Sequence, residues 1–483
     1  MSLPRVSTAR TALCLLGLLG SAVACKDRPK GEDGAAPGAP LKAAAGPPQS
    51  APQGSAGPSE AKAPAPKPVR HVLLITIDAL RADMPWIGYP RPIAPKLTAL
   101  AKQSVVYSHA YALSSYTSMS LAGLMSGRFP SELPRDGRTT SSFGPEVEML
   151  AEVLSKKDFH TLGVHGHVYF LGDTGIAQGF QEWHVVPKIT SLPARDGHIV
   201  DDKIADALIA ALEAHEKTRG KKRLLAWAHF MDPHYSYAPH DGVKYRGSAY
   251  DVDGGADAGA EADAAPVPPG VPLSEIGQRL RNGYDAEVTF TDRQVGRVLD
   301  YLSSRPYYAD TAVIVTADHG EAFGEHKSYF EHGYLLHEVT TRVPLLIRAP
   351  GLAPRRIDAR RSHIDLARTL FDLVGLPPLK TMRGTSLLPE MRGQTAPERP
   401  VILDMPYTDQ TPRRRAVIID DAKIVVTETE EVPTLFDLKQ DPTERTDLAA
   451  KNPELLGKMQ ARWKEQDRAL PDFPAPRRSK RGY

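Results

Sequence analysis

The stretch HVLLITIDALRAD, residues 71–83, is a run of β-branched and other apolar residues that ends abruptly at Asp78. A second stretch, TAVIVTADHGEAFGEH at residues 311–326, ends in the same way at Asp318 and His319. Because ligands gather beyond the carboxyl ends of the strands in a parallel α/β sheet, two such neighbouring strands would bring these three side chains together. Carboxylate and imidazole ligands suit a divalent cation, so the pattern predicts a metal site. The alternative is two buried strands followed by solvated loops.

The composition fits a large globular domain. The chain has 483 residues, of which 41% are apolar, enough for a sizeable core. Its formal net charge of +2 gives no reason to expect a nucleic acid as a partner. The two cysteines are Cys14 and Cys25, near the N-terminus. A disulfide framework and a thiol nucleophile are therefore excluded from the main domain.

The first residues have the pattern of an export signal. Arg5 and Arg10 precede an apolar run at residues 12–19, and small residues follow up to Cys25. These features define a secretory signal, and the apolar run is too short for a membrane-spanning helix. The segment resembles a bacterial lipoprotein signal at residues 1–24. This resemblance implies a lipidated Cys25 and an exported, membrane-anchored protein on the periplasmic or surface face of the cell envelope; the alternative is an ordinary cleaved signal.

Two segments lack the apolar residues that a core requires. Residues 25–69 are mostly Pro, Ala, Gly and Ser with scattered charges, which predicts a disordered, extended tether. Residues 247–270 are rich in Gly, Ala and Asp, and predict a low-complexity acidic insertion at the surface. Calcium binding is the alternative for this insertion, but its Asp residues lack the regular spacing of an EF-hand loop.

The remaining sequence alternates between strand and helix patterns. Apolar residues recur at helical spacing from Tyr284 to Leu302, and residues 223–233 have the pattern of a buried strand. This alternation predicts an α/β fold over residues 70–385, with a mostly parallel central sheet flanked by helices. Residues 386–483 are expected to form a small C-terminal subdomain with two or three antiparallel strands.

A hydroxyl-rich helix start lies in SSYTSMSLAGLMSGRFP, residues 114–130. Its apolar stripe predicts a helix that ends at Gly127, so that Thr117 and Ser118 lie at or just before the helix N-terminus. Free backbone N–H groups and the positive end of the helix dipole favour an anionic ester at this position. A hydroxyl group there could bind the metal and attack phosphorus or sulfur. The alternative is plain N-capping.

Several motifs recur along the chain in a characteristic order. They are ITIDALRAD, the helix that ends in SGRFP, HFMDPHYSY, YDAEVTFTDRQVGRVLDYL, VTADHGEAFGEH, HEVTTRVPLLIRAPG and LFDLKQDPTERTDLA. Together they resemble the sulfatase branch of the alkaline phosphatase superfamily, from about residue 70 to about residue 450. The resemblance implies an alkaline phosphatase-like fold and a hydrolase of anionic esters.

The nucleophile position departs from the sulfatase pattern. Sulfatases carry a Cys or Ser ten residues before the Gly of their Gly-Arg pair and oxidise it to formylglycine; the matching residue here is Thr117, ten before Gly127. Formylglycine cannot be made from Thr, so no formylglycine cofactor is expected. Thr occurs at this position in related phosphoryl-transfer enzymes, whose single metal site implies Asp78, Thr117, Asp318 and His319 as ligands. An imidazole ligand and a single carboxylate after the first strand favour manganese or zinc, with calcium as the alternative.

The resemblance also assigns roles to further polar residues. His234, after the Asp-Pro of HFMDPH, and His332, in FEHG, match positions beside the substrate, where general acid catalysis and charge stabilisation are needed. His165 and His167, in GVHGHVYF, match a Lys and a His that contact the ester. Arg81 is expected to bind substrate or to orient Asp78. The alternative for each of these residues is a structural role or a surface ion pair.

These observations predict a metal-dependent hydrolase that cleaves sulfate or phosphate esters. Phosphoryl monoesters or diesters are favoured because Thr117 replaces the formylglycine precursor. One alternative is a catalytically weak or inactive protein that binds an anionic glycan or a lipid headgroup. The other is sulfate ester hydrolysis with Thr117 as a direct nucleophile.

Overall fold

The computed structural model describes residues 69–172, 174–186, 200–219, 222–240, 242–250, 272–326 and 329–473. All of them belong to one compact unit, Ala65–Tyr483. The predicted signal peptide at residues 1–24, Cys25 and the tether up to residue 68 lie outside the described residues, as does the acidic insertion beyond Tyr250.

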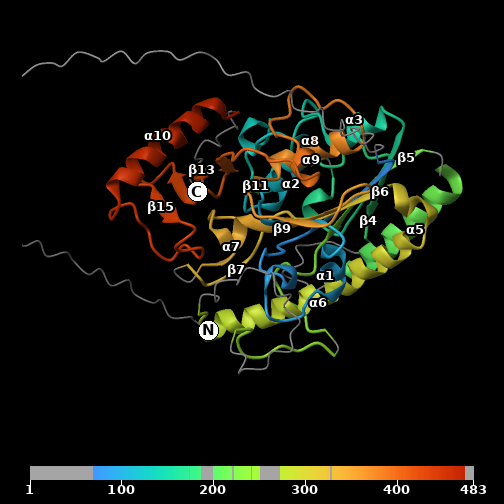
Figure 1. Cartoon of the computed structure of the whole chain (residues 1–483), viewed down its shortest axis with the longest axis horizontal. Helices are drawn as coiled ribbons and strands as arrows, with labels where there is room; N and C mark the ends of the chain where they lie inside the picture. Colours follow the sequence, from blue (N-terminus) through green and yellow to red (C-terminus); the bar gives the residue numbers. More distant parts are fainter. Residues whose placement is uncertain are drawn as a thin grey trace, which may run out of the picture. The chain divides into compact units, whose positions relative to one another are not determined.

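A nine-stranded, mostly parallel sheet forms the centre of this unit (Figure 1). The strand order is β10-β2-β9-β6-β1-β5-β3-β4, and β11 pairs with β2. Strand β9 runs antiparallel to both of its neighbours, while β1 runs parallel to β5 and to β6. The strands are β1 His71–Ile77, β2 Val105–Tyr111, β3 Phe159–His165, β4 Glu182–Val185, β5 Arg223–Phe230, β6 Thr311–Ala317, β9 Arg342–Arg348, β10 Arg355–Ile357 and β11 Arg361–Ser362.

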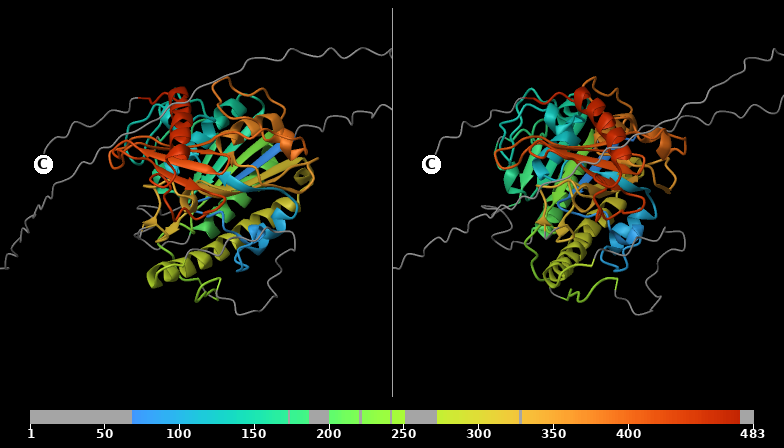
Figure 2. Two further views of the ribbon diagram at one scale, coloured as in Figure 1. Left: turned by 60° about the vertical axis from the view of Figure 1, so that its left-hand side comes forward. Right: turned by 90° about the vertical axis from the view of Figure 1, so that its left-hand side faces the viewer.

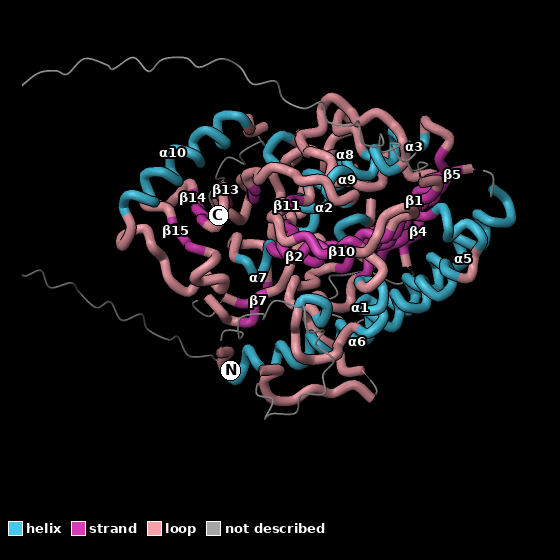
Figure 3. Tube along the Cα trace, in the orientation of Figure 1, coloured by secondary structure: helices cyan, strands magenta, loops and turns pink. Residues whose placement is uncertain are grey.

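Helices cover both faces of the sheet (Figures 2 and 3). Alternate residues of β1 point to opposite faces, so Leu73 and Ile75 join one core cluster while Val72 and Leu74 join the other. The first cluster packs α1 Pro95–Ala101, α5 Asp201–Arg219 and α6 Glu275–Ser303 against the sheet. The second cluster packs α2 Thr117–Ser126, α3 Leu150–Ser155, α8 Ile364–Leu373 and α9 Leu388–Met391. Burial on both faces explains why β1 and β6 are almost continuously apolar.

A second, antiparallel sheet lies towards the C-terminal end of the chain. Its strands, in order, are β12 Val401–Met405, β13 Arg414–Ile419, β14 Ala422–Thr427 and β15 Thr434–Asp437, and α10 Pro453–Ala469 packs on one face. The remaining elements are α7 Glu338–Thr341, the small hairpin of β7 Ala322–Phe323 and β8 Phe330–Glu331, and 3-10 turns at Pro85–Ile87, Pro130–Glu132, Val168–Phe170 and Pro306–Asp310.

The predicted α/β fold class is confirmed, including the mostly parallel central sheet, the flanking helices and the small antiparallel sheet. The helical pattern from Tyr284 to Leu302 lies within α6, which begins nine residues earlier, at Glu275. The C-terminal sheet has one strand, β12, beyond the predicted set. Among the described residues, no helix has the length and apolar character that crossing a membrane requires.

Candidate metal centre and active site

The two segments that end in acid and imidazole lie side by side at the centre of the sheet. Strand β1 pairs in parallel with β6, and Ile77 lies level with Ala317. Asp78 and Asp318 therefore follow the two strands at the same edge of the sheet and lie level with each other. The backbone N–H of Ala79 donates to Asp318 Oδ1 at 3.2 Å, which ties the two loops together. The predicted convergence of these residues is confirmed.

The side chains converge on a buried point next to His319. Its Nε2 atom lies 3.6 Å from Asp78 Oδ1, 3.3 Å from Asp318 Oδ2 and 3.0 Å from Thr117 Oγ1. Its Nδ1 lies 3.0 Å from the carbonyl oxygen of Gly320. Because a carbonyl can only accept, the ring proton sits on Nδ1, and the lone pair of Nε2 faces the carboxylates and the hydroxyl.

The donor atoms at this point fit a divalent cation. Asp78, Asp318 and His319 are fully buried, and their ligand atoms all lie within 4.8 Å of one another. Asp78 Oδ1 and Asp318 Oδ2 have no hydrogen-bond partner among the described residues. Burying carboxylate oxygens without a partner is costly, and a bound cation removes this cost. Two carboxylates, one imidazole and one hydroxyl form a site of mixed oxygen and nitrogen ligands.

Thr117 is the first residue of α2, and Tyr116, which precedes it, makes no side-chain cap. The Thr117 side chain is 2% exposed, and its hydroxyl contacts His319 instead of capping the helix. The neighbouring Ser118 hydroxyl donates to the carbonyl of Thr139 at 3.3 Å. The helix ends at Gly127, which adopts the left-handed conformation with φ of 68°. The structure thus places the Thr117 hydroxyl beside His319, one of the three residues that could hold a metal ion.

Two further imidazoles face the other oxygen of Asp78. The Nε2 atoms of His167 and His229 each lie 3.4 Å from Asp78 Oδ2, which is longer than a full hydrogen bond. His167 Nδ1 accepts the backbone N–H of Tyr169 at 3.0 Å, so in the neutral ring Nε2 carries the proton. His229, Asp78 and His167 are close enough to surround a cation. The proton on His167 Nε2 argues against this second metal site, because a ligating nitrogen needs a free lone pair.

His229 was not predicted from the sequence. Its Nδ1 lies 2.8 Å from the hydroxyl of Thr76, which also accepts the indole N–H of Trp227 at 3.0 Å. The other acceptor of the Thr76 hydroxyl, the Ala228 carbonyl, is 3.5 Å away, so the hydroxyl proton is directed to Nδ1. His229 Nε2 then carries a proton and faces Asp78. The only sequence signal was an imidazole inside an otherwise apolar strand.

His234 and His332 lie beside the metal centre, as the resemblance implied. The ring centroid of His332 is 4.1 Å from that of His319 and 4.8 Å from that of His234. His332 Nδ1 lies 3.0 Å from Glu321 Oε1, and His234 Nδ1 donates to the carbonyl of Tyr235 at 2.6 Å. Glu321 is fully buried and was missed by the sequence reasoning, although it directly follows the Asp-His-Gly motif.

The two imidazoles differ in charge. Burial opposes the charged form of His234, but the charges of Asp78 and Glu321 outweigh this effect and raise its pKa. Burial and the neighbouring charge of His234 lower the pKa of His332 to about 3. Burial also raises the pKa of Glu321 to about 7. His234 is therefore the more basic of the two imidazoles, and His332 is neutral at neutral pH.

His165 and Arg81 contact residues that surround the centre. The His165 ring packs 4.7 Å from the Trp183 ring, and its Nδ1 accepts the backbone N–H of His167 at 3.1 Å. Arg81 is 8% exposed; it forms ion pairs with Asp83 and Glu325 and donates to the Glu321 carbonyl at 2.6 Å. The guanidinium of Arg81 is therefore engaged within the protein, whereas His165 Nε2 is buried without a hydrogen-bond partner among the described residues.

Two family models match the chain. The model described as Sulfatase covers residues 70–376, which is more than half of the chain. The model described as N-sulphoglucosamine sulphohydrolase, C-terminal, covers residues 324–468.

Curated relatives and solved structures agree with these matches. The choline-sulfatase of Rhizobium meliloti is 25% identical over 432 residues, which are 78% of this chain and 82% of that protein. The crystal structure of phosphonate monoester hydrolase of Agrobacterium radiobacter is 19% identical, with a TM-score of 0.65 over 84% of this chain and 95% of that one. A protein solved in complex with its substrate D-glucosamine-2-N,6-O-disulfate is 17% identical, with a TM-score of 0.66 over 86% of this chain and 100% of that one.

Proposed function

Because the chain belongs to the sulfatase family and is a hydrolase of sulfate or phosphate esters, we propose that Thr117 is its nucleophile and that phosphate monoesters or diesters are its preferred substrates. The observation that carries this proposal is the position of the Thr117 hydroxyl, 3.0 Å from His319 Nε2 at the N-terminus of α2. The formylglycine nucleophile of sulfatases is made from Cys or Ser, and this chain has Thr117 at the matching position.

One divalent metal ion fits the site. Asp78, Asp318 and His319 would hold it, because their ligand atoms lie within 4.8 Å of one another and Asp78 Oδ1 and Asp318 Oδ2 have no hydrogen-bond partner among the described residues. Thr117 would join them through its hydroxyl, which lies 3.0 Å from His319 Nε2. The imidazole among the ligands favours manganese or zinc over calcium. When bound, the ion lowers the pKa of the hydroxyl and neutralises charge on the ester.

The remaining chemistry comes from the side chains. The Thr117 oxygen, having lost its proton to water, attacks phosphorus, and the bond from phosphorus to the ester oxygen breaks. His234, whose pKa the charges of Asp78 and Glu321 raise, gives its Nε2 proton to the departing alcohol oxygen. His167 Nε2–H and the N–H groups at the start of α2 stabilise the negative charge on the transferred group. Water then attacks the phosphothreonine and releases phosphate or a monoester.

The neighbours support phosphorus chemistry on this fold. The solved structure named phosphonate monoester hydrolase shares the fold with a TM-score of 0.65. Other neighbours act on sulfate esters, and one was solved with a disulfated glucosamine, so an anionic group on a sugar is a suitable substrate class.

The test compares ester classes in the purified full-length chain with manganese, zinc or calcium. We expect metal-dependent turnover of bis-p-nitrophenyl phosphate above that of p-nitrophenyl sulfate. Thr117→Ala should lower turnover by about a thousandfold or more, whereas Ser118→Ala, which removes an adjacent hydroxyl bonded to Thr139, should retain it. Mass spectrometry of quenched reactions should detect phosphate on Thr117.

Each alternative has its own outcome. Sulfate turnover above phosphodiester turnover would contradict the preference for phosphorus. Unchanged rates in Thr117→Ala would remove Thr117 as the nucleophile. Binding of anionic esters with no turnover under any metal would instead support a binding protein for an anionic glycan or lipid headgroup.

We also propose that the protein is exported and held at a membrane of the cell envelope by a lipid on Cys25. The support is the sequence pattern at residues 1–24, with its basic, apolar and small-residue regions in order. The Pro- and Ala-rich segment that follows would hold the catalytic unit away from the membrane surface.

A further inference from the structure

Asp78 presents its two carboxylate oxygens to different neighbours. Oδ1 lies 3.6 Å from His319 Nε2, a ligand atom of the metal centre. Oδ2 lies 3.4 Å from Nε2 of His167 and 3.4 Å from Nε2 of His229. Each of these two nitrogens carries the proton of its neutral ring, and an ionised carboxylate can only accept. The carboxylate is thus oriented with Oδ1 towards the other ligands and with Oδ2 towards N–H groups.

The pairing of β1 with β5 fixes where His229 lies relative to this carboxylate. The two strands run parallel, and His229 lies level with Thr76, two residues before Asp78. The next residue of β5 is Phe230, whose carbonyl accepts the backbone N–H of Asp78 at 2.9 Å. The backbone of Asp78 is therefore bound to the strand that carries the imidazole, so the sheet itself sets the distance between ring and carboxylate.

A hydrogen-bond chain fixes the direction of the His229 ring. The indole N–H of Trp227 donates to the Thr76 hydroxyl at 3.0 Å, and this hydroxyl donates to His229 Nδ1 at 2.8 Å. The ring of His229 stacks on that of Trp227 with centroids 5.8 Å apart, and the Phe170 ring lies 5.9 Å away. All four side chains are fully buried. Because a close-packed interior holds side chains in fixed rotamers, Nε2–H of His229 stays directed at Asp78.

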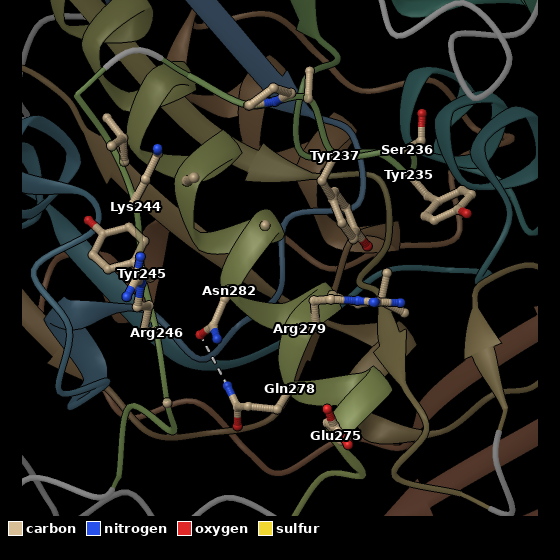
Figure 4. Close-up of a pocket in the computed structure, with 17 residues that line it drawn as sticks. Tyr235, Ser236, Tyr237, Lys244, Tyr245, Arg246, Glu275, Gln278, Arg279 and Asn282 are labelled. Carbon is tan, nitrogen blue, oxygen red and sulfur yellow. Dashed lines mark hydrogen bonds between the residues drawn. The ribbon is translucent and has the colours of Figure 1, made fainter.

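Other groups near this point have other contacts. Tyr235 and Tyr237, which follow β5, line a cavity of about 800 Å³ between this segment and α6 (Figure 4). His167 faces Asp78 Oδ2 from the far end of β3, but the proposed function gives its Nε2–H to the ester. This leaves His229 as the N–H donor that serves Asp78 Oδ2 alone.

Both carboxylates of the centre are restricted in this way. Oδ2 of Asp78 faces His229, and Oδ1 of Asp318 accepts the backbone N–H groups of Ala79 at 3.2 Å and of His319 at 2.9 Å. Each carboxylate therefore keeps one oxygen for an ion. Calcium takes about six to eight oxygen ligands and often binds both oxygens of a carboxylate. Two single oxygens, one imidazole nitrogen and one hydroxyl suit zinc or manganese better than calcium.

We propose that His229 is a positioning residue that holds Asp78 Oδ2 away from the metal, so that Asp78 binds through Oδ1 alone and the centre selects manganese or zinc over calcium. The proposal rests on the metal centre of the proposed function and assigns its selectivity. His229 acts only through Asp78, and Thr76 acts by fixing the ring of His229. Donors that orient a ligating group typically change metal affinity by about ten- to a hundredfold.

The experiment measures metal binding with no ester present. The purified full-length chain is freed of metal with a chelator, and manganese and calcium are each titrated by calorimetry. His229→Leu removes the N–H that faces Asp78, whereas His229→Gln keeps an N–H donor. Thr76→Val removes the hydroxyl that directs the ring. The matched control is Thr311→Val, the same substitution at the other end of β6, where the buried hydroxyl donates to the Tyr307 carbonyl at 2.7 Å.

We expect the parent to bind manganese more tightly than calcium. His229→Leu should reduce the ratio of manganese to calcium affinity by about tenfold or more, and Thr76→Val by about threefold or more. His229→Gln and Thr311→Val should stay within about twofold of the parent ratio. Rescue by Gln distinguishes donation of an N–H group from a role of the ring in packing.

An unchanged ratio in His229→Leu would overturn the proposal, as would a parent that prefers calcium. Equal loss of both metals in His229→Leu and in His229→Gln would overturn it as well, because packing alone would then explain the effect. If His229→Leu does not fold, Thr76→Val, which keeps the side-chain shape, decides in the same way. Failure of the proposed nucleophile is a separate result, because unchanged ester turnover in Thr117→Ala leaves the measured metal affinities as they are.

Discussion

Replacing Glu444 with Gln tests a buried charge cluster that joins the C-terminal sheet to the catalytic unit. Glu444 Oε1 lies 2.7 Å from the ammonium of Lys423 in β14. Glu444 Oε2 accepts the backbone N–H of Glu338 at 2.6 Å and lies 3.1 Å from His337 Nδ1. Lys423 is fully buried and also contacts Glu338 Oε1 at 3.1 Å. Gln has the shape of Glu without its charge, so the substitution leaves packing in place and removes one charge.

The expected loss of unfolding free energy in Glu444→Gln follows from the pKa of Glu444. Burial alone would raise this pKa, but Lys423 and His337 outweigh burial and lower it to about 2, from an ordinary value of 4.5. A shift of this size corresponds to about 3 kcal/mol. Removing one partner of a buried ion pair costs about 3–5 kcal/mol in other proteins, which agrees with this figure. We therefore expect Glu444→Gln to lose about 3 kcal/mol of unfolding free energy at pH 7.

The same pKa shift determines how the stability difference between the parent and Glu444→Gln depends on pH. The pKa of Glu444 is lower in the folded chain than in the unfolded chain, so its stabilisation is complete above the unfolded value and is lost as the pH falls towards the folded one. The difference between the parent and Glu444→Gln should therefore shrink from about 3 kcal/mol at pH 7 to about 1 kcal/mol at pH 3.

Urea unfolding at both pH values measures this difference. Glu431→Gln, an exposed residue in the same subdomain, is the control and should change stability by less than about 0.5 kcal/mol. A loss below about 1 kcal/mol at pH 7 would refute the reasoning, because it would mean that Glu338 alone compensates the buried Lys423.

Three further predictions concern the helix end, the metal and the lipid. Gly127→Ala should lower the unfolding free energy by about 2 kcal/mol, because φ is 68° and the added Cβ would lie 2.9 Å from Met382 Cγ. Gly457→Ala, in a helix with nothing within 4 Å, should instead be neutral or stabilising; equal losses in the two variants would contradict the steric argument. Asp318→Asn should abolish stoichiometric manganese or zinc in the purified protein, measured by mass spectrometry of the metal, whereas Asp310→Asn at the other end of β6 should retain it. Retained metal in Asp318→Asn would remove this residue from the ligand set. Cys25→Ser should abolish labelling by radioactive palmitate in the producing bacterium and release the protein from the membrane fraction; labelling that persists would refute attachment through Cys25.

The sequence alone was sufficient to predict the strands and helix ends that depend only on the local pattern of residues. Runs of apolar residues that end in Asp78 and in Asp318-His319 required buried strands with polar ends, since no other local structure buries both faces of so short a segment. The hydroxyls before an apolar stripe and Gly127 located the start and end of α2. The parallel sheet then follows from the alternation of strands and helices, because parallel strands need crossover helices.

Only the tertiary structure decided which side chains complete the site. His229 lies inside a strand, and its contact with Asp78 depends on β5 being the neighbour of β1, which no local pattern reports. Glu321 belongs to the site because it contacts the ring of His332, and these two residues meet only when β7 pairs with β8.

Sequence position also could not separate a substrate contact from an internal ion pair. Arg81 follows the first strand closely, but its guanidinium is bound by Asp83 and Glu325, which arrive from different loops. The spacing of apolar residues indicates whether a residue is buried, and the type of its side chain indicates what it can bind. Which partner it meets depends on strand order and on side-chain direction, and these are properties of the folded chain.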